Sequence, residues 1–252
     1  MDVYSFDRYT LTIEIFPVRI VFTLSDTTQE QSPFRYVFDG KDLTTVFAQF
    51  KEAYFDNSFF AFPLKNIRII NYLSKFTLVP RLLFDEKQKE KQMRFLFSSI
   101  EGKILAQTLQ QPEIVILHEL PKEIADFFQR TFSEAQLVHC SGELIHYYAQ
   151  LPATRKTAQM YLYQEDNQLY ITCFSSEKLL LCNSFESRNA SESLYYILYI
   201  WKQLKFDQRN DLIHIPEGDL ELIEKVRPYI AQIQTLSANF RTDYADRKAM
   251  LN

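Results

Sequence analysis

The strongest constraint on the fold is that two parts of the 252-residue chain predict the same succession of elements. Three strands, a helix, a strand, a helix and a strand follow one another in each part. Alternating apolar and polar residues indicate the strands, and apolar residues three and four positions apart indicate the helices. Two such blocks bury their apolar faces as two mixed sheets flanked by helices. We therefore predict a duplicated, three-layer α/β architecture.

In the first block the strands are predicted at 9–15, 18–24, 34–38, 113–117 and 135–139. The helices are predicted at 43–54, with Asp42 as N-cap, and at 121–132, opened by Pro121. Ser141 is expected to cap another helix at 142–150. An extra piece near 66–109 interrupts this block, with strands predicted at 67–70, 76–79 and 103–109 and a charged surface helix at 85–97.

In the second block the strands are predicted at 157–163, 169–174, 178–182, 212–215 and 229–234. Asn189 and Glu192 have the spacing of a capping box at the start of a helix that runs to about Lys205. Asp219 is expected to cap a helix at 219–226. These blocks predict an N-terminal lobe over 1–152, with an insertion near 66–109, and a C-terminal lobe over 153–252.

The chain contains four glycines, Gly40, Gly102, Gly142 and Gly218. At the usual frequency, a chain of this length carries roughly 18. Glycine lets a backbone approach a phosphate closely or adopt positive φ without strain. A chain this poor in glycine is not expected to build several nucleotide-binding loops.

Charge and hydropathy exclude several classes of partner. The formal net charge is −4 and no basic stripe is present, so neither nucleic acid nor an anionic membrane is an expected partner. No apolar run approaches the roughly 20 residues that span a bilayer, and the first residues contain no apolar signal core. We expect a soluble, cytoplasmic protein.

Cysteine and histidine patterns give no recognised reactive or metal site. The three cysteines, Cys140, Cys173 and Cys182, show no CxxC spacing, and no GxSxG elbow is present. Glu143 and His146 have the spacing of a metal-binding pair on a helix, near His139 and Cys140 in sequence. A second set of ligands is not evident, and protein metal sites need three or four. We predict no metal and no cofactor.

The doubled order of elements resembles the actin-like ATPase fold, a duplicated RNase H-like fold. The stretch Glu192–Leu204, following Phe185 and Arg188, is similar to a family of uncharacterised proteins from Bacteroidetes. The similarity extends over nearly the whole chain. The resemblance implies a bacterial protein with an actin-like fold but implies no activity.

In working members of the actin-like fold, two hairpins carry an acidic-x-glycine turn around the phosphates, and a paired-glycine loop binds adenosine. Here Glu14 stands where the first acid belongs, but Phe16 and Pro17 replace the small residues. The second hairpin, 163–168, has no glycine, and in the third loop Glu217 and Asp219 would repel a phosphate. All three loops depart from the family pattern, so nucleotide hydrolysis is not predicted. The resemblance implies an interlobe cleft, and the residues expected to line it are Glu14, Arg19, Gln164, Asp166, Glu217 and Gly218.

Three hypotheses follow. The leading one is a non-catalytic actin-like protein, a pseudo-enzyme that binds a protein partner through its surface or its interlobe cleft. The second is a divergent ATPase or small-molecule kinase that uses Glu14 and Asp166 as metal-linked carboxylates. The third is a cleft that binds another ligand, such as a nucleoside or a peptide, without turnover.

Overall fold

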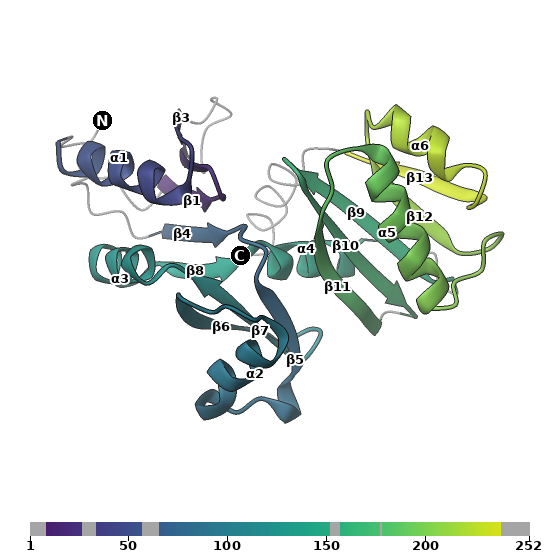
Figure 1. The fold of residues 1–252 in the computed structure, drawn as a ribbon, viewed down its shortest axis with the longest axis horizontal. Coiled ribbons are helices and arrows are strands. Elements are labelled where there is room, and N and C mark those ends of the chain that lie inside the picture. Colours follow the sequence, from purple (N-terminus) through teal and green to yellow (C-terminus); the bar gives the residue numbers. More distant parts are fainter. Residues whose placement is uncertain (1–8, 27–33, 57–65, 152–156, 177, 238–252) are drawn as a thin grey trace. The chain divides into compact units, whose positions relative to one another are not determined.

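The computed structural model describes residues 9–26, 34–56, 66–151, 157–176 and 178–237 (Figure 1). The chain divides into two compact units, Met1–Leu109 with Glu113–Cys140, and Gln110–Pro112 with Ser141–Asn252. Each unit is built on a five-stranded mixed sheet with helices packed against it.

The sheet of the first unit has the strand order β3-β2-β1-β4-β8. Its strands are β1 Tyr9–Ile15, β2 Arg19–Asp26, β3 Phe34–Asp39, β4 Asn66–Asn71 and β8 Gln136–His139. β1, β2 and β3 pair antiparallel as a meander, whereas β4 runs parallel to β1 and β8 runs parallel to β4. The parallel strands place the carboxyl ends of β1, β4 and β8 at one edge, the carboxyl edge of this sheet.

Helices α1 Leu43–Asp56 and α3 Lys122–Thr131 pack on one face of this sheet. Alternation along β1 sends Leu11, Ile13 and Ile15 into the shared core, where they meet Phe50 of α1 and Phe128 of α3. Glu14 therefore points to the opposite face. The predicted cap of α1 is confirmed, because the Thr45 N–H donates to the Asp42 carboxylate at 2.8 Å.

A separate three-stranded sheet with the order β5-β7-β6 forms the insertion. Its elements are β5 Phe76–Pro80, the 3-10 turns η3 Arg81–Leu83 and η4 Glu86–Gln88, α2 Lys89–Leu96, β6 Lys103–Leu109 and β7 Ile114–Leu120. Met93 of α2 packs with Val79, Ile104 and Leu117 in a small core of its own.

The sheet of the second unit has the order β11-β10-β9-β12-β13, which matches the first sheet position by position. Its strands are β9 Gln159–Glu165, β10 Gln168–Ser175, β11 Lys178–Glu186, β12 Leu212–Pro216 and β13 Gln232–Leu236. The antiparallel and parallel pairings also match. The predicted duplication of two mixed sheets flanked by helices is confirmed.

Helices α5 Ala190–Gln203 and α6 Leu220–Val226 share one core with this sheet. Tyr148 of α4, Cys140–Ala149, stacks on Tyr161 of β9. The α5 and α6 core uses Met160 and Leu162 of β9, so α4 packs on the other face and this unit has three layers. No helix in the described part of the chain has the length and apolar character needed to cross a bilayer.

Four predicted elements differ from the structure. The fourth strand of the first sheet is β4, whereas the strand predicted at 113–117 belongs to the insertion as β7. Both runs are short and apolar, so only their pairing distinguishes them. The charged helix predicted at 85–97 is η4 followed by α2, because the Asp85 carboxylate accepts the Lys87 N–H and caps η4.

The other two differences concern where elements begin. α4 begins at Cys140, directly from β8, and Ser141 lies buried in its first turn instead of capping it. The last strand begins at Gln232, not at Tyr229, because the turn that ends α6 continues through Tyr229 and Ile230, whose N–H groups donate to Val226.

Candidate functional site

The carboxyl edge of the first sheet is where the connection from β1 to β2 lies. Ile15 pairs with Ile20 across the hairpin and with Asn71 at the end of β4. In open α/β sheets, ligands bind outside the carboxyl ends of parallel strands. This edge is therefore the first place to examine for a binding site.

The connection between β1 and β2 is filled by an aromatic side chain. Phe16 is 1% exposed and its ring stacks on Tyr72, with ring centroids 4.3 Å apart. The guanidinium carbon of Arg19 lies 4.1 Å from the centroid of the Phe16 ring. The Phe16 N–H donates to the Arg19 carbonyl at 2.9 Å, which leaves one fewer backbone donor for an anion at this turn.

Glu14 is a buried acceptor beneath this connection. Its side chain is 5% exposed, and its Oε1 accepts a hydrogen bond from the Tyr72 hydroxyl at 3.0 Å. The same tyrosine thus stacks on Phe16 and holds the carboxylate. Tyr72 directly follows β4, and no local pattern indicates that it meets Glu14, 58 positions earlier.

The equivalent hairpin of the second unit is braced by a side-chain amide. Asp166 has a φ of 50° in the turn between β9 and β10, a conformation that Asp tolerates better than most residues. The Gln164 amide donates to the carbonyls of Asp166 at 2.9 Å and Ser187 at 3.3 Å. The Gln164 side chain therefore stabilises this turn through hydrogen bonds to its own backbone and to the neighbouring Ser187.

Glu217 and Gly218 form the turn that follows β12. The Glu217 N–H donates to the Leu236 carbonyl at 2.7 Å, and Gly218 has a φ of 93°, which requires glycine. The Asp219 carboxylate accepts the Leu222 N–H at 3.1 Å, so the predicted cap is confirmed. The carboxylate occupies the helix N-terminus that an anion would otherwise use.

The six predicted cleft residues divide between the units. Glu14 and Arg19 are joined through Phe16 and Tyr72 in the first unit. In the second, β9 and β12 run parallel, so Gln164, Asp166, Glu217 and Gly218 lie toward one edge of the same sheet. That the two sets line a single cleft stays a prediction.

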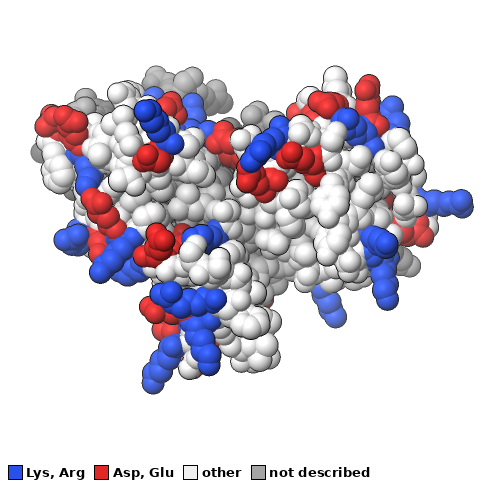
Figure 2. Space-filling view, viewed as in Figure 1, with Lys and Arg blue, Asp and Glu red and all other residues white. Residues whose placement is uncertain are grey.

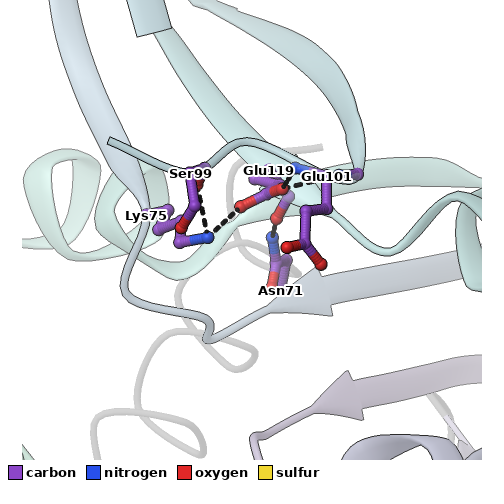
Figure 3. A network of polar contacts seen from close by, with 6 residues as sticks. Asn71, Lys75, Ser99, Glu101 and Glu119 are labelled. Carbon is purple, nitrogen blue, oxygen red and sulfur yellow. Dashed lines mark hydrogen bonds and ion pairs between the residues drawn. The ribbon is translucent and has the colours of Figure 1, made fainter. Parts of the chain in front are cut away.

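A buried polar network, which the sequence did not predict, joins β4 to the insertion (Figure 3). Asn71 is fully buried, and its amide nitrogen donates to the Glu119 carbonyl at 2.9 Å. Its amide oxygen accepts the Leu73 N–H at 2.9 Å, and its nitrogen also lies 3.0 Å from Nδ1 of His118. Because both backbone partners fix the amide orientation, Nδ1 of His118 accepts and the proton resides on Nε2.

Glu119 is the second centre of the network. Its carboxylate accepts the N–H groups of Glu101 at 2.7 Å and Gly102 at 2.6 Å and pairs with Lys75 at 2.9 Å. Lys75 also donates to the Ser99 carbonyl at 2.7 Å, as Figure 3 shows. Burial alone would raise the pKa of Glu119, but the two N–H groups and the Lys75 ammonium outweigh it, and the pKa is lowered. The one signal in the sequence is the polar pair His118-Glu119 in an otherwise apolar strand.

His118 and His139 lie beside this network, with ring centroids 5.3 Å apart. Burial lowers the pKa of His139 to about 4, although its Nε2 bonds to the Leu73 carbonyl at 2.9 Å. Burial, together with the neighbouring His139, also lowers the pKa of His118 well below its ordinary value. Both rings are neutral at neutral pH and serve as buried hydrogen-bonding groups.

A second buried polar group lies on the α4 face of the other sheet. His214 stacks on Tyr161 with ring centroids 4.2 Å apart, and both side chains form hydrogen bonds with the side-chain amide oxygen of Gln159. Burial lowers the pKa of His214 to about 4 and raises that of Tyr161 to about 12. Neither group changes charge near neutral pH.

The predicted Glu143 and His146 pair lies on α4, where His146 bonds to Gln150 at 2.8 Å. Across the described ranges, no three His, Cys, Asp or Glu side chains are placed to hold a metal ion. Among the described residues, the fold therefore brings no third metal ligand to Glu143 and His146.

The three cysteines are buried and form no disulfide bond with one another. Burial raises the pKa of Cys182 to about 12 and that of Cys173 well above its usual value. Because the thiolate is the reactive form, we expect Ellman's reagent at pH 8 to modify none of the three thiols in the folded protein and all three in 6 M guanidinium chloride. Rapid labelling of the folded protein would contradict this packing.

The two matching sheets define the class of protein: the chain has the actin-like ATPase fold. A Bacteroides thetaiotaomicron VPI-5482 protein with this fold and unknown function is 25% identical, with a TM-score of 0.84 over 100% of this chain and 98% of that one. The chain is also similar to a chain of the PilM-PilN type IV pilus biogenesis complex, at 9% identity and a TM-score of 0.50 over 90% and 88% of the chains.

The chain belongs to the family described as Protein of unknown function (DUF3822), whose model matches residues 1–233. A comparison with curated proteins gave no match. The resemblance to an uncharacterised family with an actin-like fold is therefore confirmed, whereas the loss of the ATPase motifs stays a prediction.

Proposed function

We propose that this protein is a non-catalytic, actin-like binding module that acts through a protein partner. The observation that carries the proposal is the filled connection between β1 and β2. Phe16 occupies the turn, and Glu14 is held by Tyr72 beneath it. A phosphate at this turn would need open space and free backbone N–H groups.

The loops of the second unit support the same function. The Gln164 amide closes the β9–β10 turn, and the Asp219 carboxylate caps α6 next to Glu217. An anion placed there would displace a satisfied cap and meet two carboxylates. A protein of the same fold, PilM, forms a complex with PilN, so the fold is compatible with partner binding.

The test is thermal unfolding with Mg-ATP, Mg-ADP or AMP at millimolar concentration. We expect no shift in melting temperature relative to Mg²⁺ alone. A ligand present at a hundred times its Kd would add about 2.7 kcal/mol to the folded state, which is readily measured.

A catalytically active relative of the same fold provides the positive control. A saturable shift, together with ATP turnover that is lost in Glu14→Gln, would overturn the proposal. Glutamine is the matched replacement, because it still accepts the hydrogen bond from Tyr72 but has no charge.

A further inference from the structure

The insertion exposes apolar side chains that its own core does not use. Leu82 is 93% exposed and Phe95 is 88% exposed, which makes them the two most exposed large apolar side chains in the described part of the chain. Leu83 and Leu96 are also exposed. Exposed apolar side chains mark an interaction site in a folded protein where they share one surface.

Phe95 and Leu96 line a groove of about 490 Å³ between β5 and α2. One wall is the strand segment 77–80. The other wall is formed by Gln88, which precedes α2, and by Lys91, Gln92, Phe95 and Leu96 on one face of α2. The spacing of these five residues keeps them on one side of the helix.

β5 is an edge strand of its sheet. The Lys75 carbonyl accepts the Glu119 N–H at 3.0 Å, and the Arg81 N–H donates to Glu113 at 3.1 Å, so odd-numbered residues bond toward β7. By alternation, the N–H and C=O groups of Leu78 point to the open edge. An added strand would use this donor and acceptor pair.

The helix wall also has unsatisfied polar groups. The amide oxygen of Gln92 is buried and accepts no hydrogen bond. Lys91 is the only charged residue that lines the groove, and it forms no ion pair with the described residues. Figure 2 shows Lys and Arg side chains projecting from this end of the insertion.

We propose that this groove binds an extended segment of a partner protein, which adds as a strand to the edge of β5. Its apolar side chains pack on Phe95 and Leu96, and a carboxylate pairs with Lys91. The proposal deepens the proposed function of partner binding, but it rests on the groove alone. Nucleotide binding with ATP turnover would overturn the proposed function and leave the groove intact.

Two other occupants fit less well. If the β5 edges of two copies of this chain paired, both Lys91 ammonium groups would lie in the shared groove, where like charges repel. A bilayer surface would leave the edge groups of Leu78 and the amide of Gln92 without partners in an apolar medium. A strand supplies a donor and an acceptor for the edge groups of Leu78, and its carboxylate supplies a partner for the Lys91 ammonium.

The experiment selects a displayed library of random ten-residue peptides on the full chain. We expect enrichment of peptides that alternate apolar residues with Asp or Glu. A synthetic peptide from this set should bind Phe95→Ser and Lys91→Glu at least about tenfold more weakly than the unchanged protein. Both side chains are exposed, so neither change disturbs the core.

Leu82→Ser is the matched control, because Leu82 is similarly exposed but does not line the groove. The peptide should bind this variant as tightly as the unchanged protein. The same peptide N-methylated at the residues that face β5 should not bind. No enrichment over a selection on Phe95→Ser, or full binding by the N-methylated peptide, would refute strand addition. Phe95-dependent binding to vesicles with 30% phosphatidylglycerol would favour a membrane instead, and Phe95-dependent dimers in sedimentation would favour a second copy.

Discussion

Acidification from pH 7 to pH 4 is expected to remove about 3 kcal/mol of folding free energy through His139 alone, with further losses through His118 and His214. The pKa of His139 is about 4 in the folded protein, below its value of 6.5 in an unfolded chain. The unfolded state therefore binds a proton first as pH falls. The contribution of neutral His139 to the free energy of unfolding is therefore fully present above pH 6.5, and it is lost as the pH falls from 6.5 to 4.

Urea unfolding at pH 7, 6, 5 and 4, followed by circular dichroism, measures this loss. Hydrogen exchange of the amides in β7 and β8 measures how much of this loss occurs in the first unit. Fluorescence of the single tryptophan, Trp201, follows unfolding of the second unit. His139→Gln should reduce the pH dependence, and His146→Gln, at a half-buried position of α4, is the matched control. Equal pH dependence in the two variants would disprove the role of His139.

The ionised carboxylate of Glu119 also contributes to stability, but this contribution changes over a lower pH range than that of the histidines. Its pKa is lowered below the ordinary value of 4.5, so its contribution is present above pH 4.5 and is lost as pH falls through the folded pKa. Loss of stability between pH 6.5 and 4.5 therefore belongs to the buried histidines.

The features that the sequence predicted well are local ones. The alternation of β1 and the caps Asp42, Asn189 and Asp219 depend on residues within a few positions, and the structure confirms them. The Glu192 carboxylate accepts the Arg188 N–H at 2.9 Å, close to the predicted capping box. The doubled order of elements along the chain was predicted from these local patterns.

What the sequence did not predict depends on pairing between distant positions. β4 and β7 are both short apolar strands, and only the parallel pairing of β4 with β1 places β4 in the main sheet. In the candidate site, the bulk of Phe16 was evident from the sequence. Its partner Tyr72, which also holds Glu14, follows a strand that the sequence had placed in the insertion.

The insertion depends on the same long-range contacts for its attachment. Asn71 ties the end of β4 to β7, and Glu119 ties β7 to the turn before β6. If the groove between β5 and α2 binds a partner, this network holds the groove in place on the first unit. Weakening the network should therefore reduce stability and partner binding together.

Gly102→Ala is expected to destabilise the protein by about 3 kcal/mol, the upper end of the cost of overpacking. A Cβ at this position would lie 2.4 Å from the Leu120 carbonyl oxygen and 2.8 Å from its carbon. These are backbone atoms of β7, so the clash is relieved only if β6 and β7 separate. That movement also breaks the hydrogen bond from the Gly102 N–H to Glu119.

Gly218→Ala is the matched control, because its Cβ would meet nothing within 4 Å and would strain only a backbone with a φ of 93°. That strain costs about 1 kcal/mol. Chemical denaturation of the two variants gives the difference in unfolding free energy. Equal stabilities would mean that Gly102→Ala also costs only about 1 kcal/mol, and that the Glu119 network does not hold the insertion in place.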